Sequence, residues 1–103
     1  MKLSMQDLRQ LLRPTDNSHS LKIGQRYFVR TVTHYYTGEL TAVTDADIVL
    51  EHAAWIADTG RFSAALETGE LSEVEPFPNE VIVSRSAIVD VSEWNHDLPN
   101  TVK

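Results

Sequence analysis

The chain has 103 residues, 42% of them hydrophobic, with a formal net charge of −6 and no cysteine. This length suits one compact domain with a modest core, so residues 1–103 are interpreted as a single domain. The composition excludes a disulfide framework and a thiolate metal site, its acidity argues against a non-specific DNA-binding protein, and the absence of a long apolar run argues against a membrane span.

The first predicted element is a short helix over residues 1–14, "MKLSMQDLRQLLRP", which is too polar for a signal peptide and fits a cytoplasmic protein. Leu8, Leu11 and Leu12 form one apolar stripe, and Pro14 ends the helix. Because so short a helix is marginal alone, its leucine stripe is expected to dock on another element.

Residues 25–53 have the composition of β-strands, rich in Val, Thr, Tyr and Phe. Strands are predicted over about 25–32, 34–44 and 47–53. Gly38 lies inside the second strand, where a lone glycine marks a bulge, a sharp bend or a close backbone approach.

Residues 54–78 are predicted to be a variable insert between the third and fourth strands. A short helix is expected over residues 61–67, with Gly69 ending it. The acidic run from Glu67 to Glu80 contains no base, which is typical of a solvated loop.

The segment "NEVIVSRSAIVDVSEW", residues 79–94, contains two short apolar runs joined at Arg85-Ser86. Strands are therefore predicted over 80–85 and 87–92, with almost no loop between them. This places a basic residue at a tight junction between two strands.

A polar tail over residues 93–103 closes the chain. The whole order predicts a mostly β fold, with an N-terminal helix, five antiparallel strands and a short helical insert. Five short strands are most stable when the sheet bends strongly and closes into a small barrel, which removes exposed edges.

Two stretches resemble the motifs of the Sm-like family, which contains the Sm, Lsm and Hfq proteins. "GELTAVTDADIVLEHA", residues 38–53, is similar to the first Sm motif, with its glycine at Gly38. "VSRSAIVDV", residues 83–91, is similar to the second motif, with the basic residue at Arg85. The stretches "AAWIADTGRF" and "LSEVEPFP" also resemble parts of small proteins of phages and mobile elements.

The resemblance implies an Sm-like (SH3-like) barrel that forms a cyclic homo-oligomer, because in Sm-like rings the fourth strand pairs with the fifth strand of the next subunit. It also implies a binding protein, not an enzyme, that takes RNA or a phosphate-bearing ligand at the pore and uses no cofactor. Arg85 and Ser86 would contact phosphate, and the base-side pocket would be lined by Tyr36, Thr44, Asp45 and Asp47. A generic SH3-like barrel that stays monomeric is the alternative to the ring.

The chain departs from the Sm pattern inside the expected pocket. Thr44 stands where the family has Asp, and Ser86 stands where it has glycine or, in Hfq, histidine. The neighbouring carboxylates of Asp45 and Asp47 would also repel a phosphate backbone. An equally supported alternative is that Arg85 pairs with one of these carboxylates, in its own chain or the next.

Other chemistry has weaker support in the sequence. His34 and His52 have no metal-ligand spacing, so no metal site is predicted, and no catalytic motif is present. Tyr35 and Tyr36 could stack bases, although packing in a core or an interface is the more common use.

The competing function is a protein-interaction scaffold without nucleic-acid binding. It would dock a partner through the insert over residues 54–80, chiefly the acidic run 67–80 together with Trp55 and Phe62. The negative net charge favours this alternative.

Overall fold

The computed structural model describes residues 21–103, so the helix predicted over residues 1–14 lies outside the described part of the chain. The described residues form one sheet of six strands, all paired antiparallel, and one α-helix. Within this part of the chain, no helix has the length and apolar content needed to cross a membrane.

The strands follow one another closely along the chain. The first three are β1 (Arg26–Thr31), β2 (Tyr35–Val43) and β3 (Asp47–Asp58). Helix α2 (Phe62–Thr68) and strand β4 (Glu73–Pro76) come next. The last two strands, β5 (Val81–Ser84) and β6 (Ile88–Glu93), are joined by the 3₁₀ turn η1 (Arg85–Ala87).

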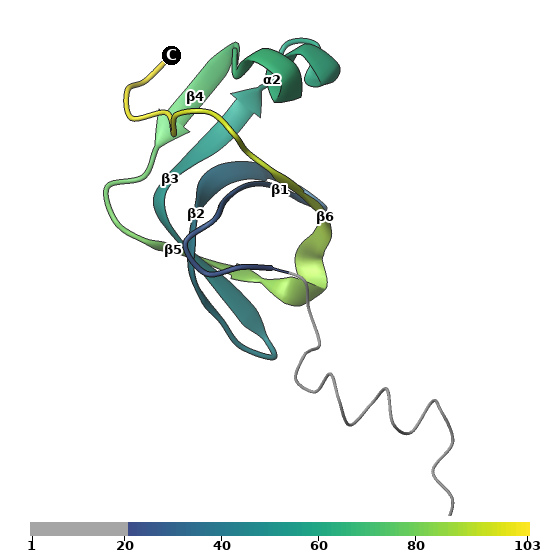
Figure 1. The fold of residues 1–103 in the computed structure, drawn as a ribbon, viewed down its shortest axis with the longest axis vertical. Coiled ribbons are helices and arrows are strands. Elements are labelled where there is room, and N and C mark those ends of the chain that lie inside the picture. Colours follow the sequence, from purple (N-terminus) through teal and green to yellow (C-terminus); the bar gives the residue numbers. More distant parts are fainter. Residues whose placement is uncertain (1–20) are drawn as a thin grey trace, which may run out of the picture.

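The strand order in the sheet is β4-β3-β2-β1-β6, and β5 also pairs with β3. Strand β3 is long enough to hold two partners along one edge: residues 47–50 pair with β5, and residues 54–58 pair with β4. Strands β4 and β5 therefore lie at different places along β3. Figure 1 shows β4 with α2 at one end of the molecule and β5 away from them. Among the described residues no ladder joins β5 to β6, which are connected through η1.

The strands predicted over 25–32, 34–44, 80–85 and 87–92 are confirmed to within one residue at each end. The predicted strand count of five is wrong, because β4 is a sixth strand inside the supposed acidic loop. The third strand also continues five residues beyond its predicted end. Strand β4 was missed because only Val74 of its four residues is buried, so its sequence is dominated by exposed glutamates.

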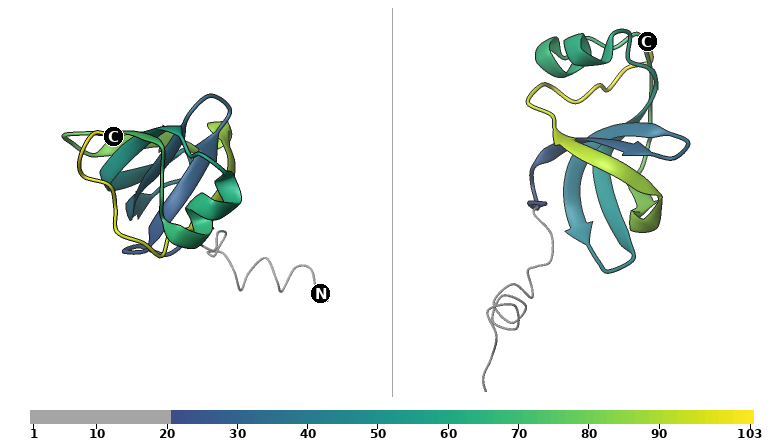
Figure 2. Two further views of the ribbon diagram at one scale, coloured as in Figure 1. Left: turned by 90° about the horizontal axis from the view of Figure 1, so that it is seen from above. Right: turned by 90° about the vertical axis from the view of Figure 1, so that its right-hand side faces the viewer.

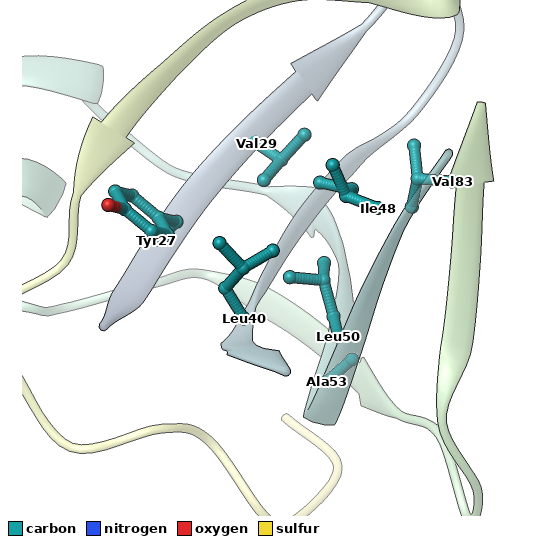
Figure 3. Packing of buried hydrophobic residues seen from close by; sticks show 7 residues of the cluster. All are labelled: Tyr27, Val29, Leu40, Ile48, Leu50, Ala53 and Val83. Atoms are coloured by element: carbon teal, nitrogen blue, oxygen red, sulfur yellow. The ribbon is translucent and has the colours of Figure 1, made fainter. Parts of the chain in front are cut away.

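Two apolar clusters pack on opposite faces of the sheet, because successive residues of a strand point to opposite sides. The first cluster, drawn in Figure 3, consists of Tyr27, Val29, Leu40, Ile48, Leu50, Ala53 and Val83. The second cluster consists of Phe28, Ala54, Ile56, Ala65, Leu71, Val74 and Trp94. The sheet therefore separates the two clusters, and α2 contributes Ala65 to the second one. This helix lies at the same end of the molecule as the C-terminus (Figure 2).

The insert supplies much of the second cluster. Helix α2 begins one residue later than predicted, and Gly69 ends it in the left-handed conformation, with φ of 83°, as the sequence indicated. The tail packs on the same side, with Leu98 against the cluster and a pair of backbone hydrogen bonds between Lys103 and Val74. The insert and the tail thus form one layer together.

Candidate functional site

Five of the six predicted binding residues meet at one place, where the turn between β2 and β3 touches the junction of β5 and η1. Thr44 and Asp45 belong to the turn, Asp47 begins β3, and Arg85 and Ser86 begin η1. The Thr44 hydroxyl accepts a hydrogen bond from the Asp47 backbone N–H at 2.9 Å, which stabilises the turn.

Arg85 is the residue that holds the two segments together. Its backbone N–H donates to the Ala46 carbonyl at 2.8 Å, and its Nη1 donates to the Thr44 carbonyl at 2.6 Å. The ion pairs of the described residues do not include Arg85, so the expected pairing with Asp45 or Asp47 of the same chain is not found. The arginine at the tight junction therefore acts first as a cross-link between backbone segments.

This arrangement makes a weak anion site within one chain. One N–H of the Arg85 guanidinium is already used on a carbonyl, and two carboxylates belong to the neighbouring segment, Asp45 in the turn and Asp47 at the start of β3. The Ser86 hydroxyl is hydrogen-bonded to the Ser84 hydroxyl at 3.0 Å. A phosphate at this place would face both the guanidinium and negative charge.

Tyr36, the sixth predicted residue, lies apart from the other five. It is the second residue of β2, whereas Thr44 follows the last residue of that strand, so the length of β2 separates them. Tyr36 instead belongs to a group of rings that the sequence did not connect.

We call this group the aromatic surface: His34, Tyr36, Trp55 and Phe77. The Tyr36 ring lies 6.3 Å from the His34 ring and 6.0 Å from the Phe77 ring, measured between centroids. His34 in turn meets Trp55 edge to face at 5.9 Å. The four rings therefore form one contiguous set, at spacings typical of aromatic pairs.

Strand register explains why these rings meet. Tyr36 lies directly opposite Val29 on β1 and Trp55 on β3, so all three side chains share one face of the sheet. Val29 is buried in the first cluster, but Trp55 lies beyond that cluster and is 37% exposed. Val29, Tyr36 and Trp55 thus form one row of side chains that runs across three strands from the core to the surface.

His34 and Phe77 reach the row from loops. The turn before β2 is fixed by Thr31, whose hydroxyl donates to the His34 carbonyl at 2.7 Å and accepts from the His34 N–H at 2.9 Å. Phe77 follows β4, and its N–H donates to the Ala53 carbonyl at 2.9 Å. Its side chain remains 38% exposed.

Carboxylates border the aromatic surface. Glu75 lies directly opposite Trp55 in the pairing of β3 with β4, on the same face. A hollow of about 400 Å³ adjoins Phe77 and is lined by Glu51, His52, Phe77, Pro78, Asn79 and Glu80. The ion pairs of the described residues use other carboxylates, those of Asp97, Asp90 and Glu70.

The structure changes the interpretation of two aromatic residues, Phe62 and Phe77. Trp55 is exposed as the interaction hypothesis required, but Phe62 packs on Phe28 in the second cluster, with ring centroids 5.6 Å apart. Phe77 was missed, although a phenylalanine between two prolines in a polar loop, "EPFPN", is a usable sign of an exposed apolar residue.

The strongest charge pair lies on the other face of the sheet. The Arg30 guanidinium donates to both carboxylate oxygens of Asp90 and lies over the Phe62 ring, 4.8 Å from its centroid. These hydrogen bonds, with the charge of Arg30, lower the pKa of Asp90 against an opposing effect of desolvation. The pKa of Arg30 is raised for the same reason. This clamp joins β1, β6 and α2 and is structural.

The described residues contain no group of three or more His, Cys, Asp or Glu side chains arranged to hold a metal ion. No protein-family model matches the chain, and a search of curated proteins finds no match to it.

Proposed function

We propose that the protein is a non-catalytic interaction module that binds another protein through the aromatic surface. The observation that carries the proposal is the convergence of four rings from four segments on one partly exposed patch. In a chain without a cysteine, the cytoplasm is the compartment that we propose for it.

A patch of contacting aromatic rings gains buried area on binding at a small cost in side-chain freedom. Trp and Tyr side chains dominate the energetics of protein interfaces because they bury large areas and have few rotatable bonds. Here the rings also contact one another, so little side-chain freedom is left to lose when a partner covers them. The patch is therefore organised before binding.

The charge distribution favours protein over nucleic acid as the partner. Residues 31–103 carry thirteen acidic and three basic side chains. A surface that binds a phosphate backbone needs more basic than acidic side chains, since affinity depends on the Lys and Arg residues that neutralise phosphates. The acidic run of the insert, residues 67–80, contains five of these acidic side chains and no basic one.

The test is retention of a partner by matched variants of the full chain. Extract of the source organism is passed over immobilised wild type, Trp55→Ala, Phe77→Ala and Val102→Ala, the last an exposed apolar residue of the C-terminal tail outside the aromatic surface. A protein retained by the wild type and by Val102→Ala, and lost from both Trp55→Ala and Phe77→Ala, supports the proposal. Equal retention by all four columns contradicts it.

A second candidate function is favoured by the free edges of β5 and β6. In the described residues β5 pairs only with β3 and β6 pairs only with β1, and exposed apolar residues lie on both strands: Ile82 (65% exposed) and Val89 (62%). We propose that these edges can pair between copies of a closed Sm-like barrel, which would repeat Arg85 around a ring and gather a site for RNA or a phosphate-bearing ligand.

The mass of the purified protein by light scattering tests this second function, with absorbance at 260 and 280 nm measured on the same peak. A mass of several chains that falls to one chain in Ile82→Lys supports the ring, and excess absorbance at 260 nm supports a bound nucleotide or RNA. A monomeric wild type contradicts the ring.

A further inference from the structure

We infer that the partner presents a positively charged segment, and that its arginine or lysine side chains lie between the rings of the aromatic surface and the carboxylates that border them. The inference rests on the proposed function, because it names the chemistry of the partner that the aromatic surface takes.

The rings leave a role for a cation that residues 21–103 do not fill. A guanidinium or ammonium group is attracted to the face of an aromatic ring, most strongly to Trp and Tyr. In the described residues both contacts of this kind belong to Arg30, which lies over Tyr35 and Phe62 near the second cluster. No cation of residues 21–103 lies over His34, Tyr36, Trp55 or Phe77 in this way.

The carboxylates make the same surface electrostatically selective. Glu75 shares the face of Trp55, and Glu51 and Glu80 line the hollow that adjoins Phe77. None of these three carboxylates takes part in an ion pair within the described residues. A cationic side chain of a partner would therefore meet a ring and a free carboxylate together, an arrangement that opposes acidic segments and steers basic ones.

The hollow beside Phe77 gives the contact a defined position. Pro78 and Phe77 supply apolar lining, and two carboxylates also line the hollow, Glu51 from β3 and Glu80 from the loop before β5. Long basic side chains have an apolar stem and a charged head, so they match a hollow with apolar walls and acidic borders.

The experiment selects peptides without assuming their sequence. A displayed library of random dodecapeptides is enriched on the immobilised full chain, and one enriched peptide is synthesised together with a copy in which every Arg and Lys is Gln. We expect enriched peptides of net positive charge, and binding that weakens about tenfold or more in the Gln copy.

Matched variants of the protein test whether the carboxylates at the aromatic surface attract the cationic peptide. Glu75→Gln with Glu80→Gln removes two carboxylates at the aromatic surface, and Glu67→Gln with Glu93→Gln removes two exposed carboxylates elsewhere. The first double variant should weaken binding of the cationic peptide by about tenfold, because the carboxylates that attract its charges are lost. The second should weaken binding by no more than about twofold. Equal weakening by both pairs would reduce the effect to net charge and overturn the inference.

The other outcomes separate the inference from the proposed function. Enriched peptides that are neutral or acidic, yet lose binding in Trp55→Ala, leave the proposed function standing and overturn the inference. No enrichment, or peptides that bind Trp55→Ala as well as the wild type, overturns both. A protein that dimerises with concentration and returns to a monomer in Trp55→Ala shows that a second copy covers the surface, which also overturns the inference.

Discussion

Gly38 on β2 faces Leu50 on β3 so closely that a β-carbon added to the glycine would lie 2.9 Å from the Leu50 Cβ. The register of the two strands breaks at this point, between the pairs Thr37–Ala54 and Glu39–Glu51. Two residues of β3, His52 and Ala53, stand opposite the single residue Gly38 of β2 and form a bulge, in which His52 has a φ of 52°. Beyond the bulge β3 carries Trp55 to the surface, so the close approach at Gly38 helps to place the aromatic surface.

Gly38→Ala should therefore destabilise the fold by about 1–3 kcal/mol, because the new methyl group would force β2 away from β3 in a packed core. Urea unfolding of the full chain measures this change. Gly24→Ala separates steric crowding from backbone strain, since a β-carbon there meets no atom within 4 Å but the φ of 92° disfavours residues other than glycine. An unchanged unfolding midpoint in Gly38→Ala would show that the strands separate without cost.

Two buried threonines should respond in opposite directions when replaced by valine. The Thr37 hydroxyl is buried and has no hydrogen-bond partner among residues 21–103, so Thr37→Val should raise the free energy of unfolding by about 1 kcal/mol. The Thr31 hydroxyl bonds to the backbone of His34, so Thr31→Val should lower it by about 1–3 kcal/mol. Thermal unfolding of both variants compares them, and a loss of stability in Thr37→Val would contradict the unpartnered hydroxyl.

The Arg30–Asp90 clamp should contribute stability that depends on pH. The pKa of Asp90 is lowered in the folded protein by the Arg30 hydrogen bonds, so the contribution is present above the ordinary carboxyl pKa of about 3.9 and is lost as the pH falls through the lowered value. Asp90→Asn should melt below the wild type at pH 7, and the two melting temperatures should converge in acid. A difference that stays constant from pH 7 to pH 3 would show that the charge of Asp90 is not responsible.

The two tryptophans should differ sharply in the stability that is lost when each is replaced by alanine. Trp94 is fully buried in the second cluster and donates its indole N–H to the Asp97 carbonyl at 3.1 Å. Trp94→Ala should therefore cost about 3–5 kcal/mol, as for other large core residues. Trp55→Ala should cost clearly less, because over a third of its side chain is already exposed. Chemical denaturation of both variants checks this order, and a severe loss in Trp55→Ala would make it unsuitable for binding experiments.

Sequence patterns were sufficient where local chemistry decides the structure. A composition rich in β-forming residues located β1 and β2, short apolar runs located β5 and β6, and the lone glycine inside β2 indicated the break in register at Gly38. The pattern failed at β4, because an edge strand with one buried residue has the composition of a loop. The continuation of β3 to Asp58 was not predicted, because residues from 54 onward were assigned to the insert. This second half of β3 pairs with β4, the strand that was also missed.

The candidate site was harder to predict because it depends on contacts between distant segments. Arg85 was identified as unusual, but its bond to the Thr44 carbonyl joins residues 41 positions apart and follows only from the packing of β5 on β3. Tyr36 and Trp55 were each considered alone. Their adjacency requires the register that the Gly38 bulge sets, and Phe77 joins them only because β4 pairs with β3.

The most direct test of the central claim uses the two indole N–H signals of the full chain in a ¹H–¹⁵N NMR spectrum. The selected cationic peptide is added to the ¹⁵N-labelled protein, with Trp55→Phe assigning the signals. The account predicts that the Trp55 signal shifts in a saturable way while the Trp94 signal, buried and hydrogen-bonded, stays in place as an internal control. Saturable binding that leaves the Trp55 signal unmoved would contradict the claim that the aromatic surface is the binding site.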